Sequence, residues 1–404
     1  MPTAADLQRE SALTVFWIFL RLGLTSFGGP VAHLGYFREE FVVRRGWLSE
    51  RSYADLIALC QFLPGPASSQ VGMAIGLARA GFGGVLAAWL GFTLPSALVL
   101  IAFAVGISSW GTALPVGVLH GLKVVAVAVV AQAIWGMARN LCTDRARITI
   151  STLAACTVLL WPTSWAQVSV IAAAAIVGLA LFKPAQDSPH DALPIRLSRR
   201  LGALLLLTFF GLLLGLPLLL QVWPSPMLAV VDAFYRSGSL VFGGGHVVLP
   251  LLQAEVVPPG WVSNDTFMAG YGAAQAVPGP LFTFAGFLGA SLPPAFTAGA
   301  WLNGLICLVV IFVPSFLLVA GALPFWEQLR SNKRTQAALA GVNAAVVGLL
   351  LAAFYQPVWT SAIVRPEDFA LALLAFVALM YWQLPPWLVV IACGAIGGLL
   401  PLVF

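Results

Sequence analysis

Two arginines, Arg21 and Arg236, each lie inside an otherwise apolar stretch of the chain. A guanidinium group holds an oxyanion through two parallel hydrogen bonds, and it stays charged at any physiological pH. A glycine cluster follows each arginine, Gly28-Gly29-Pro30 after the first and Gly243-Gly244-Gly245 after the second. Such clusters let the backbone approach a ligand closely. These residues therefore predict an anion-binding site inside an apolar protein.

A second repeated motif, Gln-x-x-Pro-Gly-Pro, is expected to interrupt two helices. It occupies residues 61–66 and again residues 275–280. Proline removes a backbone donor and glycine holds a helix weakly, so each helix should stop and restart there. The first N–H groups of the restarted helix lack intrahelical partners, and a helix N-terminus carries about half a positive charge. An anion is the natural occupant of such a break, and a kink for helix packing is the alternative.

The candidate substrate-binding residues combine these motifs with polar groups near them. They are Arg21, Arg236, Gly28, Gly29, Gly243, Gly244, Gln61, Pro64, Gly65, Pro66, Ser68, Ser69, Gln275, Pro278, Gly279, Pro280, Thr283, Lys123 and Asn343. Two arginines and several helix N-termini suit a divalent tetrahedral anion. Lys123 could add a third charge, but its counterpart is Asn343, so the symmetry fails there. For each arginine the alternative is a side chain that reaches the membrane interface.

Composition places these residues in a membrane. Of the 404 residues, 60% are hydrophobic and only 9% are charged, whereas soluble domains carry about 25% charged residues. The apolar runs are long and unbroken, which predicts an all-α polytopic integral membrane protein rather than a barrel. The net charge of +5 fits loop topology and not nucleic-acid binding. Five scattered cysteines are expected to be small buried hydrophobes, and no metal or cofactor is expected.

The apolar segments fall into two related sets around one extra segment. We predict a first repeat at 11–182, a cytoplasmic linker at 183–200, a linker transmembrane helix at 201–222 and a second repeat at 228–404. Loop 107–116 has no lysine or arginine, but the equivalent loop 324–336 holds three. Because basic loops stay inside, the two repeats should be inverted, with broken helices at mid-membrane.

The number of spans depends on the Pro-Gly-Pro segments. If each is a single broken span, the chain has thirteen spans, arranged as about six, one and six. Loop 36–52, with four arginines, then lies outside, against the positive-inside rule. If the glycine and Pro-Gly-Pro segments are re-entrant, there are nine spans and this loop lies inside. Thirteen is the favoured interpretation. Both place the N-terminus in the cytoplasm and the C-terminus outside.

The chain resembles the chromate ion transporters of the long, two-domain type. The resemblance rests on these motifs in chain order: Phe27-Gly28-Gly29-Pro30, Gly46-Trp47-Leu48-Ser49, the Pro-Gly-Pro motif at 61–66, Leu94-Pro95-Ser96, Phe242-Gly243-Gly244-Gly245-His246 and the Pro-Gly-Pro motif at 275–280. It covers nearly the whole chain except the first ten residues and 183–200. The resemblance implies thirteen helices in antiparallel halves in the bacterial inner (plasma) membrane. It also implies efflux of chromate that confers resistance, with sulfate as the structural analogue.

Several functional alternatives stay open. No P-loop motif is present, so transport would be secondary, driven by an ion gradient or by the membrane potential. A coupling proton is possible, and Asp55, Asp232 and Glu255 are the carboxylates nearest the apolar segments. Uptake or exchange of sulfate or another oxyanion is the close alternative to chromate export. A passive anion channel and an intramembrane enzyme are less favoured. The expected partners are the oxyanion and the lipid bilayer, and a homodimer is possible.

Overall fold

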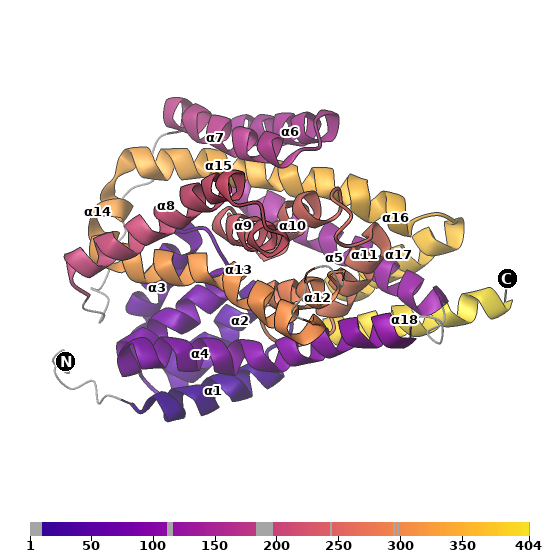
Figure 1. Ribbon diagram of the computed structural model, residues 1–404, viewed down its shortest axis with the longest axis horizontal. Coiled ribbons are helices and arrows are strands. Elements are labelled where there is room, and N and C mark those ends of the chain that lie inside the picture. Colours follow the sequence, from indigo (N-terminus) through magenta and orange to yellow (C-terminus); the bar gives the residue numbers. More distant parts are fainter. Residues whose placement is uncertain are drawn as a thin grey trace.

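The structure, a computed structural model, describes residues 10–110, 116–182, 197–242, 245–293, 296 and 299–403. These residues form helices and no strand, which confirms the all-α prediction (Figure 1). Gly243, Gly244 and residues 183–196 of the predicted linker lie outside the described residues. The helices long and apolar enough to cross a membrane are Ala67–Ser108, Gly117–Leu141, Arg199–Val222, Ala300–Phe325 and Lys333–Ala362. The chain is therefore a polytopic α-helical membrane protein.

The helices before the linker fall within the predicted first repeat. They are α1 (Ala12–Thr25), α2 (Gly29–Arg38) with a π-helical turn η1 (Glu39–Arg44), α3 (Glu50–Phe62), α4 (Ala67–Trp110), α5 (Val116–Leu141), α6 (Arg145–Leu160) and α7 (Ser164–Leu181). Helix α4 is two helices joined at a kink, because Ala80 and Gly81 have non-helical backbone angles.

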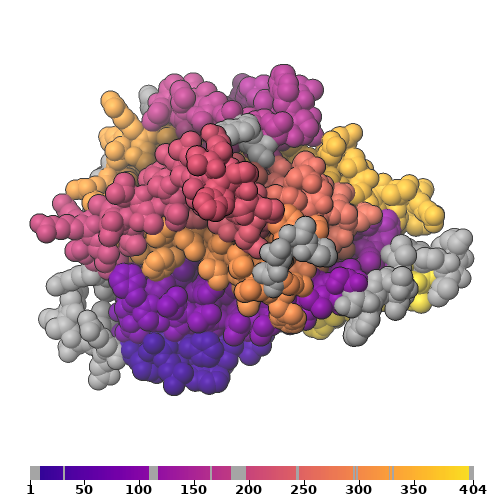
Figure 2. Space-filling model, in the orientation of Figure 1, coloured from indigo at the N-terminus to yellow at the C-terminus, as the bar shows by residue number. Residues whose placement is uncertain are grey.

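Helix α8 (Arg199–Val222) follows the linker, and the remaining helices fall within the predicted second repeat. They are α9 (Pro226–Ser239), η2 (Gly245–Val247) with α10 (Val248–Val256), α11 (Asn264–Ala274), η3 (Leu281–Thr283) with α12 (Phe284–Ala290), α13 (Ala300–Ala322), η5 (Leu323–Phe325) with α14 (Trp326–Ser331), α15 (Lys333–Ala353), η6 (Phe354–Trp359) with α16 (Thr360–Ala362), α17 (Pro366–Met380) and α18 (Pro386–Val403). Helix α8 exposes most of its residues and crosses the near face of the molecule in Figure 2.

The repeated Gly-Trp-x-Ser sequence forms a turn that starts a helix. Gly46 and Gly260 take positive φ values of 59° and 76°, which a residue with a side chain rarely adopts. The serine that follows caps the next helix, since Ser49 Oγ accepts a hydrogen bond from Ser52 N–H (3.0 Å) and Ser263 Oγ from Thr266 N–H (3.1 Å). The motif thus fixes where α3 and α11 begin, and these helices lead into the two Pro-Gly-Pro breaks.

Helices α1 and α2 form a hairpin that returns to the side from which it started. The ring of Phe19 on α1 packs against Phe37 and Phe41, with centroids 5.6 and 5.1 Å apart. Beyond them, Trp47 O accepts a hydrogen bond from Arg79 Nη2 (3.2 Å), and Arg79 O accepts one from Glu10 N–H (3.2 Å). The start of α1, the end of η1 and the kink of α4 therefore meet at one end of the molecule.

A corresponding group forms at the other end. Asp265 and Thr266, at the start of α11, line the same cavity as Gly117 at the start of α5 and Glu367 at the start of α17. In the thirteen-span interpretation, 265 and 367 lie on opposite sides of the membrane. The described contacts do not support that interpretation, and they favour the nine-span alternative. In that alternative, four short helix pairs are re-entrant, with each helix stopping at its break and the next one turning back.

A labelling experiment separates the two topologies. In a chain whose native cysteines are replaced by alanine, Arg44→Cys should react with a membrane-impermeant maleimide from the cytoplasmic face only. Pro258→Cys should react from the outer face only, because segment 246–264 returns to that face. Thr143→Cys, cytoplasmic in both topologies, is the control. The opposite pattern for Arg44→Cys and Pro258→Cys would restore the thirteen-span arrangement.

The two repeats exchange their last two helices. Helices α17 and α18 pack on α5, and α6 and α7 pack on α15, as Figure 1 shows at the right and the top of the view. Small residues allow these helices to approach closely. A Cβ on Gly121 would lie 2.2 Å from Cys393 O of α18, and one on Gly341 would lie 2.0 Å from Ala174 O of α7. Each repeat therefore completes the other, which holds the breaks of both in a common centre.

Candidate functional site

The two Pro-Gly-Pro breaks are anchored reciprocally. Gly65 N–H donates a hydrogen bond of 2.7 Å to Val241 O, which follows α9 of the second repeat. Gly279 N–H donates one of 2.9 Å to Ser26 O, which follows α1 of the first repeat. Ser26 and Val241 occupy equivalent places in the repeated sequence. Each break is therefore held by the end of the first helix of the other repeat.

Both breaks also face a proline-serine pair in a long helix of the opposite repeat. A Cβ on Gly65 would lie 2.5 Å from Ser315 Oγ of α13, and a Cβ on Gly279 would lie 2.9 Å from Ser96 Oγ of α4. The two glycines have φ values of 122° and 96°. Glycine is required here twice over, for its backbone conformation and for the missing side chain.

The described parts of the two glycine clusters also meet. A Cβ on Gly245 would lie 3.4 Å from Pro30 Cγ. Gly28 and Gly29, with φ of 98° and 77°, turn the chain from α1 into α2. From α2, His33 Nδ1 lies 3.3 Å from Ser68 Oγ, in the first turn after the first break. These contacts bring the first glycine cluster close to both breaks, and a composite binding site there stays a prediction.

Buried polar atoms around the breaks lack partners within the described part of the chain. They are Ser26 Oγ, Ser69 Oγ, Gln70 Oε1, Thr93 Oγ1, Ser315 Oγ and the Gln275 side-chain nitrogen Nε2. Other groups are internally satisfied, because Gln70 Nε2 donates to Pro64 O (2.7 Å) and Thr283 Oγ1 donates to Pro280 O (2.8 Å). Since buried polar groups are normally hydrogen-bonded, a cluster without partners indicates a place for a hydrogen-bonding guest.

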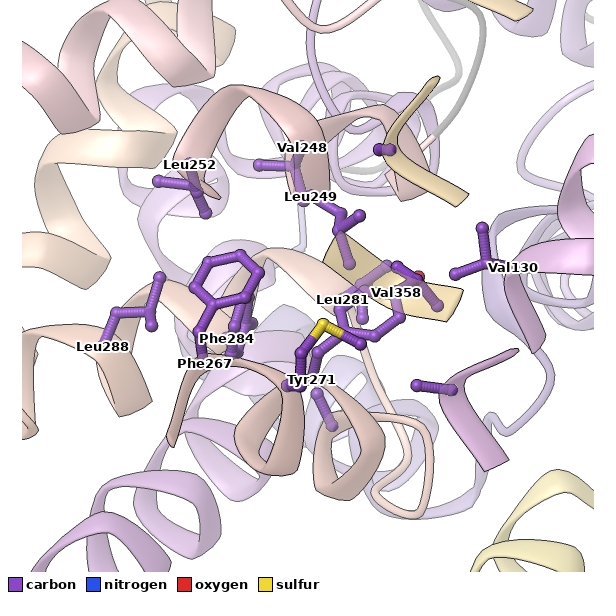
Figure 3. Packing of buried hydrophobic residues seen from close by; sticks show 14 of the residues in the cluster. Val130, Val248, Leu249, Leu252, Phe267, Tyr271, Leu281, Phe284, Leu288 and Val358 are labelled. Carbon is purple, nitrogen blue, oxygen red and sulfur yellow. The ribbon is translucent and has the colours of Figure 1, made fainter. Parts of the chain in front are cut away.

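An apolar shell surrounds the second break. Figure 3 shows Leu281, immediately after the break, among Tyr271 of α11, Leu249 of α10 and Val358 of η6. Tyr271, Leu249 and Val358 are fully buried. His246 Nδ1 lies 2.8 Å from Tyr271 Oη, so this histidine has a structural partner. A water-poor shell strengthens any electrostatic interaction made inside it.

The structure does not bring the two arginines together in any described contact. Arg21 is exposed on the face of α1 that also exposes Leu13, Trp17 and Leu24. Its placement favours the interface alternative. Arg236 Nη2 donates to Asp232 Oδ2 (2.7 Å) and to Glu255 Oε2 (3.0 Å), so its charge is already compensated. A substrate-binding role for either arginine stays a prediction.

The other predicted polar residues divide between the centre and the periphery. Ser68, Ser69 and Thr283 are buried beside the breaks, whereas Gln61 is exposed. Asn343 Oδ1 on α15 is buried and has no partner within the described residues. Lys123 lies away from the breaks and forms an ion pair of 2.9 Å with Asp265. Together these two line a cavity of about 660 Å³.

Sequence reasoning missed Gln70 and the pair His120–Asp368. Gln70 is fully buried one turn after the first break, and an amide at that position was the available signal. His120 Nε2 lies 2.8 Å from Asp368 Oδ1, a contact between residues 248 positions apart that no local pattern reveals. Within the described ranges, no group of three or more His, Cys, Asp or Glu side chains could hold a metal ion.

We expect Gln70→Leu to slow anion flux about tenfold, because it leaves the buried Pro64 carbonyl without its donor beside the site. The matched control is Gln167→Leu. Gln167 of α7 is also buried, and its side chain donates a hydrogen bond of 3.4 Å to a proline carbonyl, Pro250 O of α10. Both variants should lower the unfolding temperature of the purified protein, and Gln70→Leu alone should slow flux per folded molecule. Equal flux in the two variants would contradict a role for Gln70 at the site.

Broken helices inside a polytopic α-helical membrane protein are typical of membrane transporters. The family model described as chromate transporter matches residues 13–179 and 228–398, on both sides of α8, and the chain belongs to this family.

Relatives of full and half length support this membership. The chain is 30% identical over 357 residues to the chromate transport protein of Pseudomonas aeruginosa, covering 83% of this chain and 78% of that protein. It is 27% identical over 348 residues to the uncharacterized transporter MJ0718 of Methanocaldococcus jannaschii, covering 85% and 83%. The uncharacterized transporter YwrA of Bacillus subtilis is 28% identical over 171 residues, covering 41% of this chain and 93% of that protein. No solved structure matches the chain.

Proposed function

We propose that this protein is a secondary transporter that exports chromate through a dianion site at the centre of two inverted repeats. The observation that carries the proposal is the reciprocal anchoring of the breaks, Gly65 to Val241 and Gly279 to Ser26. This anchoring would bring together two helix N-termini and several hydroxyl and amide groups that have no partner among the described residues. Membership of the chromate transporter family and the name of the Pseudomonas aeruginosa relative support chromate as the substrate.

Neutral donors would hold the anion in this site. After the two breaks, helix α4 begins at Ala67 and η3 begins at Leu281. The first N–H groups of each element point out of the helix toward the break. Ser26, Ser69 and Ser315 add hydroxyl donors. Their Oγ atoms have no partner among the described residues, so binding an anion would break no existing hydrogen bond. Helix N-termini favour a negative charge electrostatically, and the apolar shell increases that effect. A site without a fixed full charge also releases a dianion more readily than one that contains free arginines.

The membrane potential can drive export. Moving a dianion out of a negative-inside cell is favoured by about 4.6 kcal/mol at 100 mV, so no coupled proton is required. In this proposal the N-terminus is cytoplasmic and the C-terminus lies outside the bacterial inner membrane. The basic segment around Arg44 and Arg45 then faces the cytoplasm, as the positive-inside rule requires.

Proteoliposome flux tests the proposal. Purified protein in liposomes should carry labelled chromate at a rate that rises with an imposed membrane potential, and unlabelled sulfate should compete. Protein-free liposomes and a Gly279→Leu protein, which inserts but cannot form the break, are the controls. Sulfate flux without chromate flux would identify the close alternative, and conductance far above carrier rates would identify a channel. No flux of either anion would overturn the proposal.

A further inference from the structure

A cavity separate from the breaks lies where α5, α11, α17 and α18 meet. It measures about 660 Å³, within the usual range of ligand pockets. Its ionisable lining consists of Lys123, His120 and Arg365 together with Asp265, Glu367 and Asp368. Under the proposed topology this cavity opens to the outer face of the membrane.

The two members of the pair Lys123–Asp265 differ sharply in burial. The Lys123 side chain is 13% exposed, whereas that of Asp265 is 76% exposed. A nearly buried ammonium needs a counter-ion, but an exposed carboxylate can turn to water at little cost. Asp265 is therefore the replaceable partner, and Lys123 is the group that must always have one.

By contrast, the second interacting pair of the cavity, His120 and Asp368, is fixed. Asp368 is buried, its Oδ1 lies 2.8 Å from His120 Nε2, and its Oδ2 accepts hydrogen bonds from Val364 N–H (3.0 Å) and Arg365 N–H (2.9 Å). Displacing it would leave two backbone donors unpaired as well. Only the Lys123–Asp265 pair can open to admit an anion.

The floor of the cavity separates it from the second break by a thin contact. Ala269 of α11 lines the cavity, and one turn further on a Cβ on Gly272 would lie 2.1 Å from Leu122 O of α5. Gln275 follows at the break itself. Lys123 follows Leu122 in α5, so its positive charge lies on the cavity side next to this contact.

The positions equivalent to Lys123 and Asp265 in the other repeat do not carry a lysine and an aspartate. Asn343 stands where Lys123 stands in the first repeat, and Arg51 is the counterpart of Asp265. The charge pattern is thus one-sided, although the backbone arrangement is repeated.

From these observations we propose that the cavity is an outer oxyanion site, in which a tetrahedral dianion replaces Asp265 as the counter-ion of Lys123. The site rests on the proposed transport function and gives it an exit step. Asp265 competes with the anion, so occupancy is brief and release to the outside follows. Glu367 and Asp368 add negative charge that also opposes retention.

Right-side-out membrane vesicles that hold the full chain and are loaded with labelled chromate test this site. Unlabelled sulfate added outside should alter efflux, and its half-effective concentration measures the outer site. We expect Asp265→Asn to lower that concentration about tenfold, because the competing charge is gone, and Lys123→Asn to raise it about tenfold. Half-effective concentrations on the cytoplasmic side should stay within twofold for both variants.

The control is Asp144→Asn, which removes an ion pair of 2.7 Å with Arg147 in the first turn of α6 and keeps a helix-capping side chain. It should behave as the wild type. The proposal would be overturned if Asp265→Asn and Lys123→Asn shifted the half-effective concentration in the same direction, and if the exchange Lys123→Asp with Asp265→Lys reversed both shifts. The pair would then have a structural role only. If the wild type carries neither anion, the proposed function fails. Equilibrium binding of labelled sulfate to purified wild type and Asp265→Asn then still tests the cavity, and equal binding would overturn the outer site.

Discussion

Gly65→Ala should reduce chromate flux about tenfold or more, with the protein still present in the membrane. The added Cβ would lie 2.5 Å from Ser315 Oγ and 2.7 Å from Gln70 Nε2, at a backbone φ of 122°. A side chain in such a conformation costs about 1–3 kcal/mol, even before the clash is counted. The least costly relaxation moves the break away from Val241 O and separates the first break from the second repeat. Gly279→Ala should act in the same way through Ser96 Oγ, 2.9 Å from the new Cβ.

The matched controls are Gly46→Ala and Gly260→Ala. Both glycines have positive φ, but a Cβ on either would meet nothing within 4 Å. They therefore carry the backbone strain without the contact at the break, and flux should fall less than threefold. Initial rates of labelled chromate uptake into proteoliposomes, corrected for the amount of folded protein, measure the effect. Equal losses in all four variants would mean that strain alone, and not the geometry of the breaks, limits transport.

The repeated motifs were sufficient to predict where the chain breaks, because proline and glycine act locally. Gly46-Trp-Leu-Ser49 and Gly260-Trp-Val-Ser263 end in helix caps, and the two Pro-Gly-Pro motifs end helices α3 and α11. The number of membrane spans, in contrast, depends on tertiary packing. Whether α2 continues across the membrane or turns back beside α1 is decided by the packing of Phe19 on Phe37 and Phe41, which no hydropathy pattern contains.

In the candidate site, too, locally determined features could be predicted, whereas features that depend on tertiary packing could not. Glycines of the repeated motifs could be predicted as special backbone positions, and Gly28, Gly29, Gly65 and Gly279 do have positive φ. Charged residues were harder to place. Arg21 and Arg236 are equivalent in sequence, but α8 packs against α9 and not against α1, so the two arginines meet different surroundings. The carboxylate of Asp232, one turn before Arg236, replaces Trp17 of the first repeat and gives Arg236 an internal partner.

Arg236→Ala is expected to destabilise the protein by about 3 kcal/mol, because it leaves Asp232 and Glu255 close together without their shared cation. Asp232 and Glu255 side chains are only 7% and 14% exposed, so water cannot replace the guanidinium fully. Arg21→Ala should change stability by less than about 0.5 kcal/mol, since its side chain is exposed. Thermal unfolding of both purified proteins in detergent, with the amount of protein recovered from membranes, gives the comparison.

A double variant separates charge balance from substrate binding. Arg236→Gln combined with Asp232→Asn removes one positive and one negative charge, so it should recover at least half of the stability lost in Arg236→Gln alone. If Arg236 serves only to neutralise its neighbours, this double variant also regains chromate flux. If the double variant is stable but does not carry chromate, the guanidinium is a ligand of the anion in another state of the transport cycle. In that case Arg236 stays paired with Asp232 and Glu255 while the centre is empty. It then binds the dianion only when the anion enters the site.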